Sequence, residues 1–266
     1  MFALDGMLVL AGSLTGLLVG LTGVGGGAVM TPLLLLVFEV APMSAIGTDL
    51  WFAAITKIAA SRIHHGSGLI DWQVVRRLWA GSLPSSALTL AWMAVYPIGT
   101  ATAAFLKVAI ACAVVLTALA MLFQKHLHAL GRRIRTAADS ADHFKAVQAP
   151  LTIAAGALLG VLVTLTSIGA GALGVVFLAY LYPLRLTPSR LIATDIVHAI
   201  PLAMFAGAGH LLIGNVNFGL LGNLLVGSIP GVLAGAMLSS RLPQAVLRRA
   251  LSAILLFTGF KLLHVA

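Results

Sequence analysis

Charged residues are scarce in this sequence, and acidic residues are the scarcest of them. Only 9% of its 266 residues are charged, whereas soluble domains contain about a quarter. The chain has 7 acids and 1 cysteine. The single cysteine, Cys112, excludes an intrachain disulfide and a cysteine-ligated metal site. We therefore expect no enzymatic centre built on clustered carboxylates, no cofactor and no metal ion.

Apolar residues are correspondingly abundant. They make up 60% of the chain, and the mean hydropathy is +1.07. Nearly uncharged runs occur at 110–123, 220–238 and 251–263. With their flanks these runs reach the length of roughly 20 residues that a helix needs to cross a bilayer. The sequence predicts an all-α integral membrane protein, and because no Lys or Arg precedes the first apolar segment we expect its N-terminus to be uncleaved.

The basic residues lie mainly between the apolar runs. The net charge is +9, but pairs such as Arg76 with Arg77 and Arg132 with Arg133 sit where loops are predicted. Loops on the cytoplasmic side of membrane proteins carry such an excess. We expect contact with membrane lipids and none with nucleic acid.

The chain contains an internal duplication. Residues 12–28 and 156–172 share 10 of 17 identities at an offset of 144 (156 − 12). Thr48-Asp49 matches Thr194-Asp195 at an offset of 146 (194 − 48). The same offset relates His64, Gly68, Gly81, Ser82 and Pro84 to His210, Gly214, Gly227, Ser228 and Pro230. Glycines, prolines and intramembrane acids do not recur in one order by chance, so the halves are versions of one unit.

Each half reads as a glycine-interrupted segment followed by three apolar helices. The predicted segments are 6–40, 44–63, 76–96 and 101–123, then 150–183, 187–209, 216–238 and 246–264. This gives a first transmembrane repeat at 1–123, a basic cytoplasmic linker at 124–149 and a second repeat at 150–266.

Loop charges predict how the halves are oriented. In the first half the basic loop lies between the second and third segments, whereas in the second half the loops on either side of that position are basic. The positive-inside tendency therefore predicts inverted repeats with both termini outside the cytoplasm. Each glycine-broken segment would then be re-entrant or cross twice. The alternative, eight spans with parallel halves, places Arg185 and Arg190 opposite the other basic loops.

The two glycine clusters predict an anion site. A continuous helix would satisfy its own backbone, and a break is tolerated only against protein or a water-filled cavity. Helices that restart near Ala28 and Ala172 would present unpaired N–H groups and positive dipole ends, which together could hold a small anion near the bilayer midplane. The predicted substrate-binding residues are Thr22, Gly23, Gly25, Gly26, Gly27, Ala28, Thr48, Thr166, Ser167, Gly169, Ala170, Gly171, Ala172 and Thr194.

The alternative is that glycines only let helices pack closely. We favour this interpretation for Gly12, Gly16, Gly156 and Gly160, and the site for the two breaks.

Two acids, Asp49 and Asp195, fall within predicted spans at equivalent positions. Such residues cost roughly 3 kcal/mol on insertion scales and are functional candidates. His198 follows Asp195 by one turn, and Lys57 follows Asp49 by about two. These four residues are the predicted proton-coupling group. The alternatives are that the acids hold the bundle together, that His198 is a satisfied core residue, and that Lys57 either extends toward the cytoplasm or attracts the anion.

The motifs described so far resemble the sulfite exporter TauE/SafE family of membrane transporters. The resemblance covers nearly the whole chain. It rests on Leu21-Thr-Gly-Val-Gly-Gly-Gly27, Ile46-Gly-Thr-Asp-Leu50, His64-His-Gly-Ser-Gly-Leu-Ile-Asp-Trp72, Ala193-Thr-Asp-Ile196, Gly209-His210 and Gly214-Asn-Val216. It implies export, or in some members uptake, of small sulfur-containing or carboxylate anions.

Three functions remain in competition. The first is a proton-coupled secondary transporter that exports sulfite or an organosulfonate such as sulfoacetate across the bacterial inner membrane. The second is a passive anion channel, or an importer of small sulfur-containing or carboxylate anions. The third, an intramembrane enzyme, is disfavoured because the chain has one glutamate and no Gly-x-Gly-Asp motif. The sequence gives no indication of oligomeric state.

Overall fold

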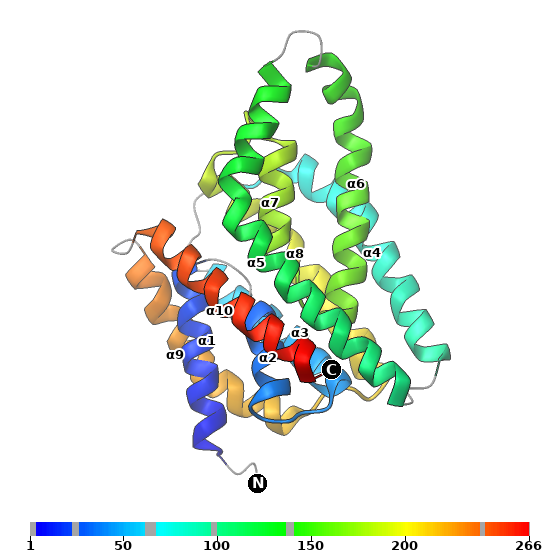
Figure 1. Ribbon diagram of the computed structural model, residues 1–266, viewed down its shortest axis with the longest axis vertical. Helices are drawn as coiled ribbons and strands as arrows, with labels where there is room; N and C mark the ends of the chain where they lie inside the picture. Colours follow the sequence, from blue (N-terminus) through cyan, green and yellow to red (C-terminus); the bar gives the residue numbers. More distant parts are fainter. Residues whose placement is uncertain are drawn as a thin grey trace.

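The computed structural model describes residues 4–22, 27–61, 68–96, 100–136, 141–239 and 243–265, and within these ranges it is helical without β-strands (Figure 1). The helices are α1 (Gly6–Thr22), α2 (Gly27–Leu36), α3 (Pro42–Ser61), α4 (Trp72–Val95), α5 (Thr100–Thr136), α6 (Ala141–Thr166), α7 (Ala172–Leu181), α8 (Pro188–Leu212), α9 (Phe218–Leu238) and α10 (Gln244–Val265). In Figure 1, α6 and α7 lie in the upper part of the molecule and α1 and α2 in the lower part.

Of the described helices, 5 are long and apolar enough to cross a membrane. They are Trp72–Val95, Thr102–Ile134, Ala146–Thr166, Pro188–Leu212 and Phe218–Leu238. The predicted spans α3 and α10 are not in this set; α3 carries Asp49 and Lys57, and α10 carries two arginines in its first turns. The α3 charges are buried inside the bundle instead of facing lipid.

The first helix of each half packs against the second unbroken helix of the other half, α1 on α9 and α6 on α4. A Cβ added to Gly12 would lie 2.1 Å from the Leu224 carbonyl oxygen, and one added to Gly156 would lie 2.3 Å from that of Leu78. In both contacts the backbone of one helix lies directly against a glycine of the other, as is usual where small residues let membrane helices pack closely. The packing role predicted for these glycines is confirmed.

The starts of α4 and α9 are fixed in the same way. The N-cap residues Asp71 and Asn217 accept bonds from Val74 and Leu220 N–H groups. The Asp71 N–H donates to Thr194 Oγ1 of α8 at 3.1 Å. The Asn217 N–H likewise donates to Thr48 Oγ1 of α3, also at 3.1 Å. Each N-cap is thereby tied to the opposite half.

α5 extends far beyond its predicted span. The sequence placed the end of the span at residue 123, but the helix continues through the polar stretch to Thr136. Its extension packs on α7: His128 Nδ1 lies 3.2 Å from the Ala179 carbonyl oxygen, and Gly131 lies against the Tyr180 backbone. The first part of the linker is thus helical. Its cytoplasmic location stays a prediction.

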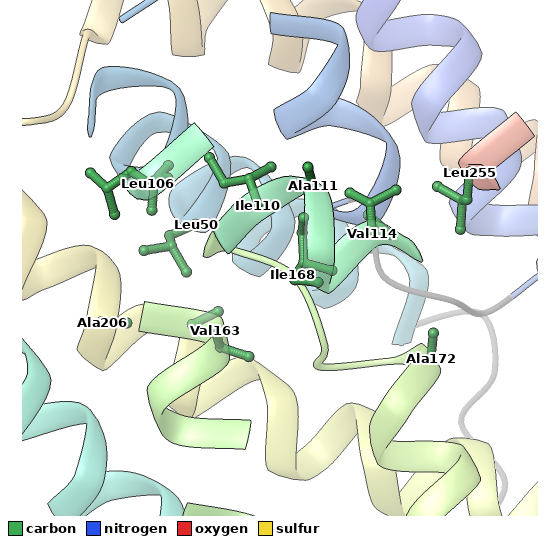
Figure 2. Close-up of a cluster of buried hydrophobic side chains, with 14 of the residues drawn as sticks. Leu50, Leu106, Ile110, Ala111, Val114, Val163, Ile168, Ala172, Ala206 and Leu255 are labelled. Carbon is green, nitrogen blue, oxygen red and sulfur yellow. The ribbon is translucent and has the colours of Figure 1, made fainter. Parts of the chain in front are cut away.

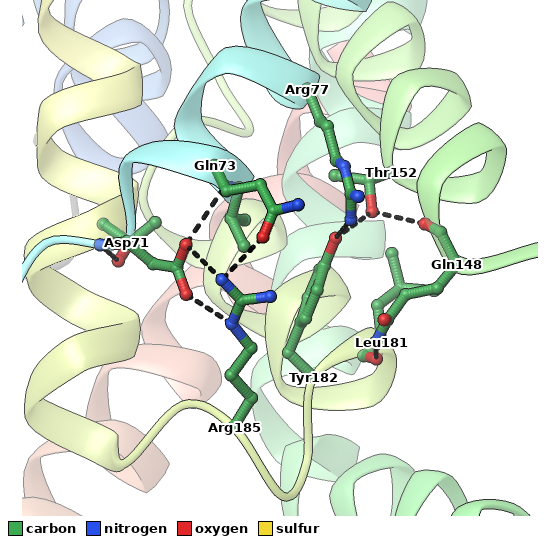
Figure 3. A network of polar contacts seen from close by, with 10 residues as sticks. Asp71, Gln73, Arg77, Gln148, Thr152, Leu181, Tyr182 and Arg185 are labelled. Carbon is green, nitrogen blue, oxygen red and sulfur yellow. Dashed lines mark hydrogen bonds and ion pairs between the residues drawn. The ribbon is translucent and has the colours of Figure 1, made fainter. Parts of the chain in front are cut away.

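A polar network joins the turn between α7 and α8 to α4 and α6 (Figure 3). The Arg185 guanidinium donates to both Asp71 carboxylate oxygens, at 2.6 and 2.9 Å, and to Gln73 at 2.9 Å. Beside this ion pair, the Arg77 guanidinium donates to the Tyr182 hydroxyl at 3.1 Å. The Tyr182 hydroxyl in turn lies 2.8 Å from the Thr152 hydroxyl. The basic loops of the two halves therefore meet at one end of the molecule.

Candidate functional site

The predicted break in the second half is confirmed. α6 ends at Thr166, and α7 begins at Ala172. Between them Gly169 and Gly171 have φ values of 121° and 117°, a region that side-chain-bearing residues rarely adopt. Ser167, with φ 59°, also lies in the left-handed region. The glycine pattern is thus a local requirement for this turn.

The start of α2 lies against the interruption of the second half. α1 ends at Thr22 and α2 begins at Gly27, while the predicted site residues Gly23, Gly25 and Gly26 lie outside the described residues. Gly27 packs so closely on the second break that an added Cβ would lie 2.0 Å from the Ser167 carbonyl oxygen.

Apolar side chains surround the contact between the start of α2 and the 167–171 turn, which we call the junction. Ala28, Ile168 and Ala172 belong to one buried cluster with Leu50 of α3 and Ile110 of α5. Figure 2 shows Ile168 in the turn between α6 and α7 and Ala172 at the start of α7, with Leu50 and Ile110 nearby. A charged group placed here is therefore removed from bulk water.

Lys57 brings a positive charge to the junction. Its side chain is only 3% exposed, and its Nζ donates to the Ala170 carbonyl oxygen at 3.1 Å. It lies within electrostatic range of both Asp49 and Asp195. Lys57 therefore does not extend toward the membrane surface; it ends at the second break.

Each intramembrane acid lies near the start of a restarted helix. Asp49 is fully buried and its Oδ2 accepts a hydrogen bond from the Thr31 hydroxyl of α2. Asp195 is 1% exposed, faces the Gly171 N–H, and has its Oδ1 where a Gly174 side chain would be. The two carboxyl groups thus occupy equivalent places in the two halves.

The amides at the start of α7 are largely engaged, contrary to the expectation that they are free. The Leu173 and Gly174 N–H groups donate to the Gly169 carbonyl oxygen at 3.1 and 3.2 Å. Since Asp195 faces Gly171, a negatively charged side chain already stands at this positive helix end. An anion binding here would have to compete with that carboxylate.

His198 lies on the same face of α8 as Asp195. Its Nε2 is 3.0 Å from the Ser82 hydroxyl of α4, and its carbonyl oxygen accepts from Trp79 Nε1 at 3.2 Å. It is fully buried, and its Nδ1 has no hydrogen-bond partner among the described residues.

Several polar atoms without hydrogen-bond partners among the described residues belong to the buried centre, the group formed by Lys57, Asp49, Asp195 and the 167–171 turn. Asp49 Oδ1, Asp195 Oδ1, Ser167 Oγ and His198 Nδ1 are buried without a hydrogen bond to the described chain. The Ser167 hydroxyl lies near the Asp49 carboxyl but does not reach bonding geometry. Since buried polar atoms are normally satisfied, such a group points to a bound solute, ion or water.

Other predicted residues have different surroundings. The Thr22 and Thr166 hydroxyls each donate to a carbonyl of their own helix, at 2.6 Å in both cases. The Thr48 and Thr194 hydroxyls accept from the N-caps of α9 and α4.

Two residues that sequence reasoning missed are Thr31, which bonds Asp49, and Ser82, which meets His198. Ser82 is repeated as Ser228, and that repetition was the available signal. Within the described ranges, no group of three or more His, Cys, Asp or Glu residues could hold a metal ion.

Long apolar helices around a buried cation and two buried acids are typical of a multi-pass membrane transporter. The sulfite exporter TauE/SafE family matches residues 8–262, and the chain belongs to that family. It is 36% identical over 257 residues to the probable membrane transporter protein YjnA of Bacillus subtilis (strain 168), covering 96% of this chain and 98% of that protein. It is also 36% identical over 85 residues to a probable membrane transporter protein of Haemophilus influenzae, covering 29% of this chain and 32% of that protein. No solved structure matches the chain.

Proposed function

We propose that this protein is a proton-coupled secondary transporter that moves a small anion, sulfite or an organosulfonate such as sulfoacetate, out of the bacterial cytoplasm. One observation carries the proposal: a buried lysine, Lys57, ends at Ala170 in the 167–171 turn, and Ser167 of the same turn packs against Gly27 of α2. A buried ammonium group needs a negative partner, so an anion that pairs with Lys57 when the nearby carboxyl groups are protonated gains a strong attraction. The family's description as sulfite exporters supports the substrate class and direction.

We further infer that the halves are inverted repeats, in which each broken helix pair enters and leaves the membrane on one side. Both ends of the α6–α7 pair lie together, because Gln148 Nε2 donates to the Leu181 carbonyl oxygen. The start of α1 and the end of α2 likewise line one apolar groove, which includes Met7 and Phe38. Since the turn of α6–α7 meets the start of α2, the two pairs enter from opposite ends. This arrangement is common at the substrate sites of secondary transporters.

The buried acids give the proposed site a link to protons. Asp49 and Asp195 lie within range of Lys57, so their negative charge competes with an anion for the same cation. Protonating a carboxyl removes that competition, and a bound anion in turn favours the protonated form. By thermodynamic reciprocity, proton and anion binding then strengthen each other, so the two move together. A doubly charged anion exported with one proton still carries negative charge outward, and an inside-negative membrane potential favours that movement.

Purified protein in proteoliposomes is expected to take up radiolabelled sulfite or sulfoacetate faster than protein-free vesicles. With a proton gradient imposed, the wild type should accumulate the anion above its equilibrium distribution. Accumulation distinguishes a coupled transporter from a passive channel, which cannot concentrate its solute. Absence of flux for sulfite, sulfoacetate and short carboxylates would contradict the proposal, and flux without accumulation would favour the channel.

Asp195→Asn is expected to abolish the pH dependence of anion binding while retaining binding itself. Asparagine keeps the size of the side chain but has no proton to exchange, so the reciprocity is lost. The measurement is the affinity for sulfoacetate against pH near neutrality, where the charge of this ligand is constant. Glu39→Gln serves as the matched control, because Glu39 is an exposed acid outside the proposed site. A pH dependence of wild-type size in both Asp195→Asn and Asp49→Asn would contradict a coupling role.

A further inference from the structure

A pocket of about 400 Å³ opens between the end of α5, the turn joining α7 to α8, and the start of α10. Its polar lining is basic or neutral: Lys125, His128 and Arg248, with Gln124 and Thr187. A second pocket of about 130 Å³ shares Lys125 and Arg248 and adds Arg249. No acid among the described residues lines either pocket, so both carry a positive potential that attracts anions.

The walls of the larger pocket lead toward the buried centre. Leu191 and Ile192 of α8 line it, and they precede Asp195 by about one helical turn. Val175 of α7 also lines it, directly after Gly174, whose Cα faces the Asp195 carboxylate. The same two helices therefore form both the wall of the pocket and the surroundings of Asp195.

The helix ends around the pocket add to its attraction for anions. α8 begins at Pro188, and its N-cap Thr187 lines the pocket, so the positive end of a 25-residue helix points to this region. The pocket also lies at the end where Arg77 and Arg185 gather, the end that the positive-inside tendency assigns to the cytoplasm.

We propose that this basic pocket is the cytoplasmic entrance of the transport pathway, where Lys125 and Arg248 concentrate the anionic substrate before it reaches Lys57. This inference rests on the proposed function. The pocket acts by raising the local concentration of the anion, as charged clefts do for their substrates. It contributes no group to the buried centre, so its residues set the apparent affinity for the substrate and leave the later steps unchanged.

The test is the initial rate of radiolabelled sulfite uptake into inside-out membrane vesicles, which expose the cytoplasmic face. At low ionic strength the double variant Lys125→Gln with Arg248→Gln is expected to raise KM about tenfold with an unchanged maximal rate. The difference should shrink in high salt, because mobile ions screen exposed charges. Lys125→Glu reverses the charge at an exposed position and is expected to raise KM further than Lys125→Gln.

The matched control is Arg133→Gln, which removes one exposed charge from the same helix outside both pockets. Its KM should equal that of the wild type. If the wild type takes up sulfite but the double variant has an unchanged KM, the entrance is contradicted and the proposed function stands. If the double variant instead lowers the maximal rate only in vesicles containing anionic phospholipid, the pocket holds a lipid headgroup, which also overturns the inference. Wild-type vesicles without uptake would overturn the proposed function and the entrance together.

Discussion

Replacing Lys57 with methionine is expected to lower anion transport at least about 100-fold, because removing one partner of a buried charge group costs several kcal/mol. Methionine keeps most of the length and the apolar contacts of the side chain but removes the ammonium group, which donates to the Ala170 carbonyl oxygen. The measurement is sulfite flux in proteoliposomes, made on protein that elutes as a single species in detergent.

Lys261→Met is the matched control for this substitution, since Lys261 is an exposed lysine of α10. It should transport at the wild-type rate. Lys57→Arg is expected to retain part of the activity, because it restores the positive charge with a different shape. Wild-type flux in Lys57→Met would show that the buried lysine does not serve the anion.

Gly27→Ala is expected to weaken anion binding about tenfold and to destabilise the fold by roughly 1–3 kcal/mol, the usual cost of forcing an extra carbon into a packed contact. The added Cβ would lie 2.0 Å from the Ser167 carbonyl oxygen. A backbone oxygen inside a tight turn cannot move away on its own, so the two interruptions must separate. Thermal unfolding and sulfite-dependent stabilisation would measure both effects.

Gly6→Ala makes the same chemical change where nothing lies within 4 Å of the new carbon. It should leave both the unfolding temperature and the sulfite response unchanged. If Gly27→Ala binds sulfite as tightly as the wild type, the contact between the interruptions is packing alone.

Much of the fold could be predicted because its signals are local. Glycines at 169 and 171 permit the positive φ values of the turn, so the helix restart at Ala172 followed from the sequence. The extension of α5 to Thr136 did not follow. It is supported by contacts of His128 and Gly131 with α7, which lies about 50 residues further along the chain.

The charged residues of the site could be predicted from the sequence, whereas the contacts of its polar residues could not. Asp49, Asp195 and Lys57 stood out because ionisable residues are rare inside membranes. The repeated threonines, Thr48 and Thr194, also stood out, yet their hydroxyls bond N-caps contributed by the other half. A repeated motif identifies equivalent positions, and only the tertiary arrangement separates those that anchor helices from those that face a buried centre.

The central claim is that an anion binds where the two helix interruptions meet. Selenite is a heavier analogue of sulfite, and its anomalous scattering would locate it in crystals grown with the anion. We predict a selenium peak beside the Lys57 ammonium group, next to the 167–171 turn. A peak confined to other parts of the protein, in crystals of a preparation that transports sulfite, would contradict the claim.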